Sequence, residues 1–165
     1  MLKLLQINQN NEDNYNSIIM STQTYHNIWM HFIWTTKKRE RVLNKNLKSK
    51  LIKHYFDYAK ENDIKIDIIN GDMDHLHFLI QLQPKQNPSN IANLLKGESS
   101  NWINKNDFLR GKFAWQSGYA VFSVSQSKVQ TVRNYINNQE EHHRQKSFKE
   151  EYDSFMKVYA SDETP

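Results

Sequence analysis

The sequence predicts an α+β fold, in which an antiparallel sheet carries two helices on one face. Aromatic and branched residues are concentrated between Tyr25 and Thr35, as expected for a strand. Apolar residues recur at helical spacing between Leu47 and Ala59, and again between Ile91 and Ile103. Each helical segment is followed by β-rich sequence, so the predicted order is β-α-β-β-α-β.

The first strand and first helix are separated by a basic segment. One face of the strand would hold His26, Ile28, Met30, Phe32 and Trp34. The basic residues that follow are Lys37, Lys38, Arg39 and Arg41. Lysines then alternate with the apolar positions of the helix, which predicts an amphipathic helix of about four turns.

A β-hairpin is predicted next. Ile64 to Ile69 forms its first strand, and Met73 to Leu82 returns antiparallel to it. Asn70 and Gly71 would supply the positive φ angles of a tight turn between the two. Pro84 ends the second strand because proline cannot donate to a sheet ladder.

The second helix and the last strand complete the pattern. Asn87 and Pro88 have the residue types of an N-cap and a first helical position. The segment from Phe113 to Ser125 is β-rich, with Gly118 at a turn or bulge. This order of elements is that of the ferredoxin-like, split βαβ fold, which leaves one sheet face available for binding.

Two further helices follow the last strand, each with the spacing of a capping box. Ser127 and Gln130 would open the first, which carries Val132 and Ile136 on its apolar face. A shorter helix is predicted after Ser147.

The chain is predicted to form one domain, residues 20–160, behind a disordered leader, residues 1–19. The leader is rich in asparagine and has neither helical nor strand periodicity, and Met20 is a candidate for the true start. The 165 residues and 38% hydrophobic content suffice for one core.

Composition also excludes several classes of protein. The chain has no cysteine, which excludes disulfides, thiolate zinc sites and cysteine nucleophiles. No apolar run approaches the roughly 18 residues of a membrane span, so a soluble, cytoplasmic protein is expected. A formal net charge of +4 permits a nucleic-acid partner without requiring one.

His75 and His77 are the first candidate site residues. Residues i and i+2 of a strand project from the same face, so these imidazoles can converge on one ion, while Leu76 and Phe78 face the core. A pair of partly exposed sheet histidines without a ligand accounts for so short a motif equally well.

Tyr135 and Gln139 lie one helical turn apart on the predicted helix, close to its apolar stripe. Two imidazoles and an amide oxygen suit Mn²⁺ or Mg²⁺, and a tyrosine can attack a phosphodiester if the site compensates for its pKa of about 10. Taken alone, the pair is also compatible with a core tyrosine and a glutamine at the helix edge.

These residues resemble a known family. His75-Leu76-His77 is similar to the HUH motif (His, apolar, His) of single-strand DNA transposases and relaxases. The segment 135–139 resembles the tyrosine helix of insertion-sequence transposases and of REP-associated tyrosine transposases. Further similar segments are 31–39, 95–102, 115–119, 122–125 and 138–143. The resemblance covers residues 24–152 in the family's order, and the leader departs from it.

The resemblance implies a ferredoxin-like homodimer that acts on single-stranded DNA near a small hairpin. His75, His77 and Gln139 would bind Mg²⁺ or Mn²⁺. Tyr135 would attack a DNA phosphate, which leaves a 5′-phosphotyrosine link and a free 3′-OH. The tyrosine helix can pack against either subunit in such a dimer.

Other residues and other functions stay open. The basic residues Lys37, Lys38, Arg39 and Arg41 are predicted to contact DNA phosphates, with a solvated turn as the alternative. His142 and His143 fit solvated helix-end residues or DNA-backbone contacts better than metal ligands. The main alternative function is a catalytically idle nucleic-acid-binding module of the same fold. A metal hydrolase that uses water is the third possibility, and it would not need Tyr135.

Overall fold

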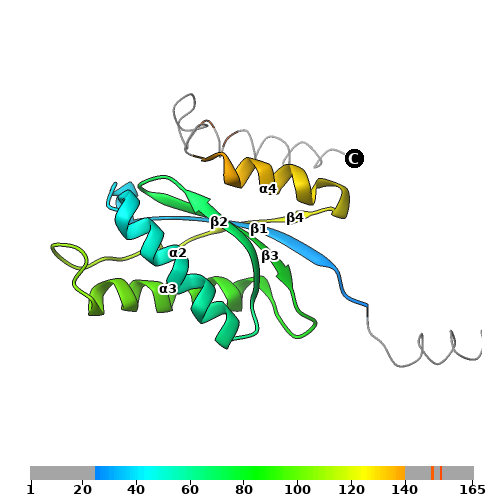
Figure 1. Ribbon diagram of the computed structural model, residues 1–165, viewed down its shortest axis with the longest axis horizontal. Helices are drawn as coiled ribbons and strands as arrows, with labels where there is room; N and C mark the ends of the chain where they lie inside the picture. The colour runs from blue at the N-terminus through cyan, green and yellow to red at the C-terminus, as the bar shows by residue number, and fades with distance from the viewer. Residues whose placement is uncertain (1–24, 140–149, 151–152, 154–165) are drawn as a thin grey trace, which may run out of the picture.

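The computed structural model describes residues 25–139 together with Glu150 and Asp153. Its elements are β1 (Ile28–Thr35), the 3₁₀ turn η1 (Lys37–Arg39), α2 (Lys45–Glu61), β2 (Lys65–Gly71), β3 (His75–Leu82), α3 (Pro88–Lys105), β4 (Ala120–Val124), the 3₁₀ turn η2 (Gln126–Lys128) and α4 (Val129–Asn137). Figure 1 shows their arrangement. The predicted leader and nearly all of the last predicted helix lie outside the described residues.

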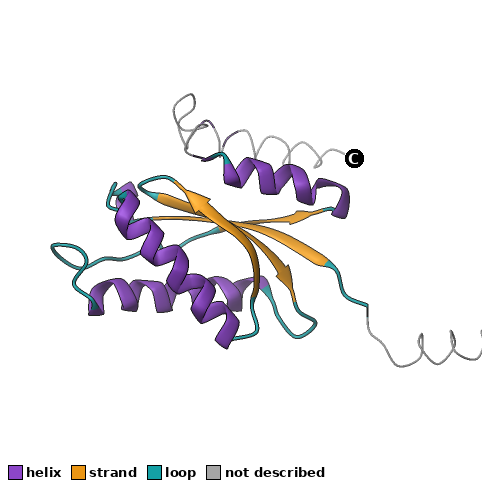
Figure 2. Ribbon diagram, in the orientation of Figure 1, coloured by secondary structure: helices purple, strands orange, loops and turns teal. Residues whose placement is uncertain are grey.

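The four strands form one antiparallel sheet in the order β2-β3-β1-β4. Helices α2 and α3 cover one face of this sheet and α4 lies over the other, as Figure 2 shows. The predicted α+β class and the β-α-β-β-α-β order are therefore confirmed. No helix within the described part of the chain is long and apolar enough to cross a membrane.

The main core lies between the sheet and helices α2 and α3. Phe32 and Trp34 of β1 point into it, as the period of two predicted, and Leu76 and Phe78 of β3 join them. The rings of Trp34 and Phe78 stack with centroids 4.0 Å apart. Because alternate residues of a strand point in opposite directions, this core places His75 and His77 on the other face.

The turn before β3 differs from the prediction. Asn70 and Gly71 do not form a tight turn: they extend β2 and pair with His77 and Leu76. The chain reverses over residues 72–74, where the segment after β1 holds it. Gly71 is required here by a close approach, because a Cβ atom at this position would lie 2.2 Å from the carbonyl oxygen of His75.

The predicted last strand is much shorter than expected. Only Ala120–Val124 is regular strand, and residues 113–119 contribute a single bridge between Thr36 and Trp115. Side chains of α3 bind the backbone instead: Asn104 Oδ1 accepts a hydrogen bond of 2.7 Å from the Phe113 amide. Lys96 Nζ donates to the carbonyl oxygen of Gly118 at 2.8 Å.

The helix ends agree in part with the predictions. Asn87 is the N-cap of α3, since its side-chain oxygen accepts a hydrogen bond from the Asn90 amide at 2.9 Å. The capping box predicted at Ser127 is wrong. Ser127 lies within η2, and α4 begins without a side-chain cap.

Candidate active site

His75 and His77 lie on the sheet face opposite α2 and α3, and both are fully buried. Their ring centroids are 5.1 Å apart, with the ring planes at 81°. They face Thr35 and Ile33 across the β1–β3 ladder. The prediction that these histidines are partly exposed in the alternative without a ligand is therefore wrong.

Helix α4 covers this face from above β2 and β3. Val129 and Ile136 pack against Leu79 of β3 and Val124 of β4 in a second, smaller apolar cluster. This apolar stripe is the one predicted from the helical spacing of the sequence. It anchors the helix directly beside the histidine pair.

Polar contacts fix the position of α4 along the sheet. The β2–β3 ladder has an irregularity between Ile66 and Ile68, and the carboxylate of the intervening Asp67 accepts hydrogen bonds of 2.7 and 3.1 Å from the guanidinium of Arg133. At the other end, Asn70 Nδ2 donates to the carbonyl oxygen of Asn137 at 3.0 Å.

Tyr135 of α4 points toward the histidines of the same chain. Its ring centroid lies 5.7 Å from that of His77 and 6.2 Å from that of His31. The two rings of each pair meet at nearly a right angle. The tyrosine and the histidine pair, far apart in the sequence, are thus neighbours within one chain.

Gln139 is fully buried just beyond the end of α4. The Asn138 amide still donates to the carbonyl oxygen of Asn134 at 3.1 Å, so helical geometry continues to this point. Gln139 therefore follows Tyr135 by about one turn on the same side of the helix. A fully buried amide needs polar partners within the protein, whereas the amide of a glutamine at an exposed helix edge can bind water.

His31 was not among the residues predicted for the site. It lies on the histidine face of β1, and its Nε2 atom is 2.9 Å from Nδ1 of His77. Burial lowers the pKa of His31 from 6.5 to about 3, so its imidazole is neutral at physiological pH. The period of two contained the signal: with Phe32 and Trp34 assigned to the core, His31 falls on the same face as His75 and His77.

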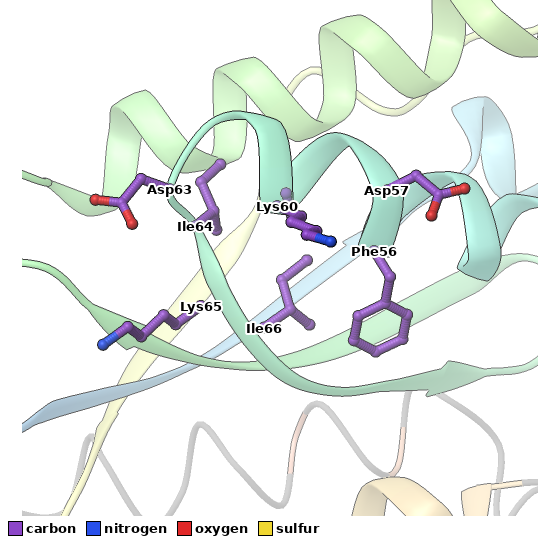
Figure 3. Close-up of a pocket in the computed structure, with 8 residues that line it drawn as sticks. Phe56, Asp57, Lys60, Asp63, Ile64, Lys65 and Ile66 are labelled. Carbon is purple, nitrogen blue, oxygen red and sulfur yellow. The ribbon is translucent and has the colours of Figure 1, made fainter.

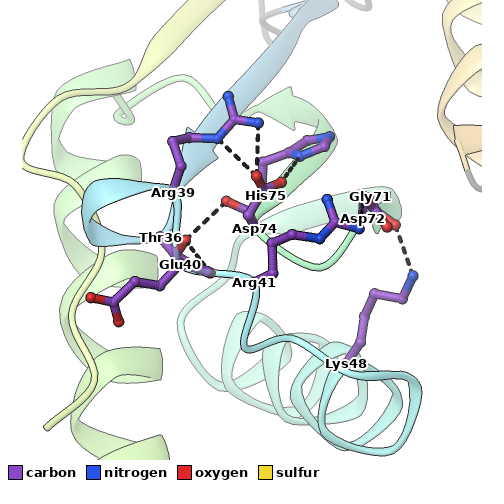
Figure 4. A network of polar contacts seen from close by, with 9 residues as sticks. All are labelled: Thr36, Arg39, Glu40, Arg41, Lys48, Gly71, Asp72, Asp74 and His75. Carbon is purple, nitrogen blue, oxygen red and sulfur yellow. Dashed lines mark hydrogen bonds and ion pairs between the residues drawn. The ribbon is translucent and has the colours of Figure 1, made fainter. Parts of the chain in front are cut away.

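Asp74 is the second residue that the sequence reasoning missed. Its Oδ1 accepts a hydrogen bond of 2.7 Å from Nδ1 of His75, and its Oδ2 accepts from the Arg39 guanidinium (Figure 4). Burial raises the pKa of Asp74, but the hydrogen bonds from His75 and Arg39 outweigh burial and hold that pKa at about 2. Its adjacency to His75 in the sequence was the available signal.

The basic segment after β1 divides into two kinds of residue. Lys37 and Lys38 are exposed. Arg39 is bound to Asp74, and Arg41 forms an ion pair of 3.1 Å with Asp72. Phosphate contact stays a prediction for the segment, although the structure gives both arginines carboxylate partners.

The donor set fits a divalent metal. His75 uses Nδ1 toward Asp74, and His77 uses Nδ1 toward His31, so both rings present Nε2 as the remaining nitrogen. Backing of a histidine by a carboxylate is typical of metal sites. Within residues 25–139 no three His, Asp or Glu side chains are grouped as a metal site. An amide oxygen, such as that of the buried Gln139, is another ligand type that a divalent metal accepts.

A cavity elsewhere on the surface does not belong to this site. It encloses about 540 Å³ between the C-terminal end of α2 and the start of β2, with Phe56, Lys60 and Ile66 among its lining residues (Figure 3). None of the predicted site residues lines it. The candidate chemistry instead lies under α4, where the side chains are packed rather than open to solvent.

Comparisons with known proteins found two similar solved structures. A crystal structure of a candidate transposase from Deinococcus radiodurans R1 is 26% identical, with a TM-score of 0.57, and the match covers 72% of this chain and 94% of that chain. A REP-associated tyrosine transposase bound to a REP hairpin is 12% identical, with a TM-score of 0.48 and coverage of 71% and 68%. Curated proteins gave no significant match.

The family comparison is more direct. The sequence profile of the family described as IS200-like transposases matches residues 24–139, which include the sheet, α4 and all the buried polar residues described above. Because this match spans well over half of the chain, the protein belongs to the IS200-like transposase family.

Proposed function

We propose that this transposase cleaves and rejoins single-stranded DNA with a divalent metal, through a covalent bond between the DNA and Tyr135. The observation that carries the proposal is the distance of 5.7 Å between the ring centroids of Tyr135 and His77. The phenol lies beside a fully buried histidine pair, and a buried amide follows the tyrosine by about one helical turn. A passive nucleic-acid-binding surface needs none of these groups.

His75, His77 and Gln139 would hold Mg²⁺ or Mn²⁺. Two imidazole nitrogens favour the softer Mn²⁺, whereas an amide oxygen suits either ion. Such an ion would polarise a phosphate oxygen and orient the scissile phosphate. The chain's own part would be to hold the ligands: β3 would provide the histidines, and the residues just beyond α4 would provide Gln139.

Tyr135 would act as the nucleophile. Its Oη attacks the phosphorus and gives up its proton to a water molecule that enters the site with the DNA, so that a bond between Oη and phosphorus forms. The bond from phosphorus to the 3′ oxygen breaks, and that oxygen takes up a proton to become a free 3′-OH. Attack by a 3′-OH on the 5′-phosphotyrosine reverses the step, so rejoining needs no nucleotide cofactor.

The substrate we propose is single-stranded DNA beside a small hairpin, bound by a homodimer in the cytoplasm. The exposed lysines of η1 would contact its phosphates. Helix α4 packs on the sheet of its own chain, which supports attack by Tyr135 within one subunit.

A labelled-strand assay tests this function. Hairpin-bearing single strands, labelled at either end, are incubated with Mn²⁺ and the protein, then separated under denaturing conditions. A 5′-phosphotyrosine link places the 3′ label on the protein and releases the 5′-labelled fragment. Tyr135→Phe should lose the adduct yet keep its melting temperature and hairpin affinity, because only the reacting oxygen is removed.

Tyr119→Phe is the matched control, since this tyrosine lies just before β4 and packs against the main core. It should form the adduct normally. An adduct in Tyr135→Phe would assign the nucleophile elsewhere. A wild-type protein that binds hairpins but never forms an adduct would leave the idle binding module as the better reading.

A further inference from the structure

Arg39 is the outer member of a chain of contacts that ends at His75. Its Nε and Nη2 atoms donate to Asp74 Oδ2 at 2.9 and 2.8 Å, and Asp74 Oδ1 accepts from His75 Nδ1 at 2.7 Å (Figure 4). Asp74 and His75 are buried, whereas the Arg39 side chain is 40% exposed. One carboxylate thus joins a surface guanidinium to a buried imidazole.

The backbone of η1 is bent to make this contact. Lys38 and Arg39 both adopt left-handed φ angles, 55° and 60°, which cost on the order of 1 kcal/mol each for residues other than glycine. The result is that the Arg39 side chain turns back onto Asp74 instead of extending into solvent. A strained conformation of this kind is retained where the surrounding structure enforces it, and it points to a function.

Neighbouring hydrogen bonds enforce the bend. The Thr36 amide donates to the carbonyl oxygen of Asp74 at 2.8 Å, and the Leu43 amide donates to that of Met73 at 2.8 Å. Both ends of the basic segment are therefore tied to the turn that precedes β3. The Thr36 hydroxyl closes the segment on itself by donating to the carbonyl oxygen of Glu40 at 2.7 Å.

We propose that Arg39 is a positioning residue for metal binding by His75. It holds the Asp74 carboxylate in place, and the carboxylate fixes the His75 ring with its proton on Nδ1 and with Nε2 directed at the ion. This inference rests on the proposed function, since it requires His75 to be a ligand. It also separates Arg39 from Lys37 and Lys38: the lysines contact DNA, whereas Arg39 acts on the metal site.

The guanidinium suits this role better than an ammonium. Two N–H groups of Arg39 converge on one carboxylate oxygen, which restrains both the distance and the direction of the carboxylate. A lysine would supply the charge without the fork. Arg39→Lys should therefore retain part of the metal affinity that Arg39→Ala loses.

The test compares Arg39→Ala and Arg39→Lys with Arg41→Ala. Arg41 is the matched control, because it lies two residues further on and pairs with Asp72 instead of Asp74. Mn²⁺ affinity is measured by calorimetry on tag-free protein without DNA, and the visible absorption of bound Co²⁺ reports the ligand geometry. Hairpin affinity and its salt dependence are measured in EDTA.

Arg39→Ala should weaken Mn²⁺ binding by up to about 10-fold, the lower end of the loss expected when a direct partner of a ligand is removed, and alter the Co²⁺ spectrum. In Mn²⁺ affinity, Arg39→Lys should fall between Arg39→Ala and the wild type, and Arg41→Ala should match the wild type. The hairpin affinity of Arg39→Ala in EDTA, and its salt dependence, should equal those of the wild type. Wild-type Mn²⁺ affinity in Arg39→Ala, or a flattened salt dependence with unchanged metal binding, would overturn this role. A wild-type protein that binds no Mn²⁺ would instead remove the proposed metal site itself.

Discussion

The Nε2 atom of His31 lies 2.9 Å from the Nδ1 atom of His77, and the two buried rings stack with centroids 5.2 Å apart. For His77 to offer Nε2 to an ion, its Nδ1 has to carry the proton and donate it to His31. A neutral His31 can accept that hydrogen bond, and burial keeps it neutral. His31 would thus accept a hydrogen bond from Nδ1 of His77, as Asp74 accepts one from Nδ1 of His75.

Replacing His31 should therefore weaken metal binding. His31→Phe leaves the Nδ1–H of His77 without its acceptor, and the ring is free to rotate or to change tautomer. We expect about a 10-fold loss of Mn²⁺ affinity by calorimetry. His54→Phe is the control, because His54 stacks on Trp102 among the helices and should leave Mn²⁺ affinity unchanged. Equal affinity in the two variants would deny His31 this role.

The buried neutral His31 also predicts a pH dependence of stability. The unfolded chain binds a proton at this residue below about pH 6.5, whereas the folded chain does so only near pH 3. The contribution of neutral His31 to the free energy of unfolding is therefore complete above pH 6.5 and is lost as the pH falls toward 3. Between pH 7 and pH 4 it amounts to about 3 kcal/mol. The free energy of unfolding is measured in urea on metal-free protein at both pH values. Its decrease from pH 7 to pH 4 should be smaller in His31→Phe than in the wild type by this amount.

Two substitutions of Gln139 separate a ligand from a merely buried amide. Gln139→Glu keeps an oxygen at the same reach and adds a negative charge, so Mn²⁺ binding should persist or tighten and some adduct should form. Gln139→Leu suits the apolar surroundings of Ile136, so the fold should survive while the adduct with Mg²⁺ disappears. Melting temperature and adduct yield are measured together. Full activity in Gln139→Leu would require another third ligand.

The exposed lysines of η1 should account for part of the DNA affinity. Replacing Lys37 and Lys38 with alanine should weaken binding to every hairpin strand tested. The log–log salt slope should fall by roughly 0.7 for each contact to a single strand, or 0.9 to a duplex stem. The double variant of Lys60 and Lys65, which removes equal charge beside the cavity of Figure 3, should keep the wild-type slope. If the two slopes fall alike, the effect is one of net charge.

Gly71 should tolerate no side chain. The Cβ of Gly71→Ala would lie 2.2 Å from the His75 carbonyl oxygen and 2.9 Å from the Leu76 Cα, and both are backbone atoms that cannot move aside cheaply. We expect a loss of about 2–4 kcal/mol in urea unfolding. Gly97→Ala in α3 meets open space and should be neutral or gain up to about 1 kcal/mol. Equal stability of the two variants would contradict this account.

The spacing of residues within single elements was sufficient to predict much of this fold. The core face of β1, the helices α2 and α3, and the shared face of His75 and His77 all follow from spacings of 2 or 3.6 residues, which act within a single element. The Asn87 cap was predictable for the same reason, because its partner lies three residues away. Helical spacing also brought Tyr135 and Gln139 together on one side of the predicted helix, and the resemblance to a known family supplied the roles proposed for them.

What the tertiary structure decided depends on contacts between distant segments. The tight turn predicted at Asn70 and Gly71 failed because backbone groups after β1 hold the chain reversal at residues 72–74. Arg39 was assigned with the lysines because composition does not reveal Asp74 as its partner. His31 was not predicted as a site residue because a single histidine forms no motif. Its contact with His77 depends on the register of β1 with β3, which is determined by hydrogen bonds across the sheet.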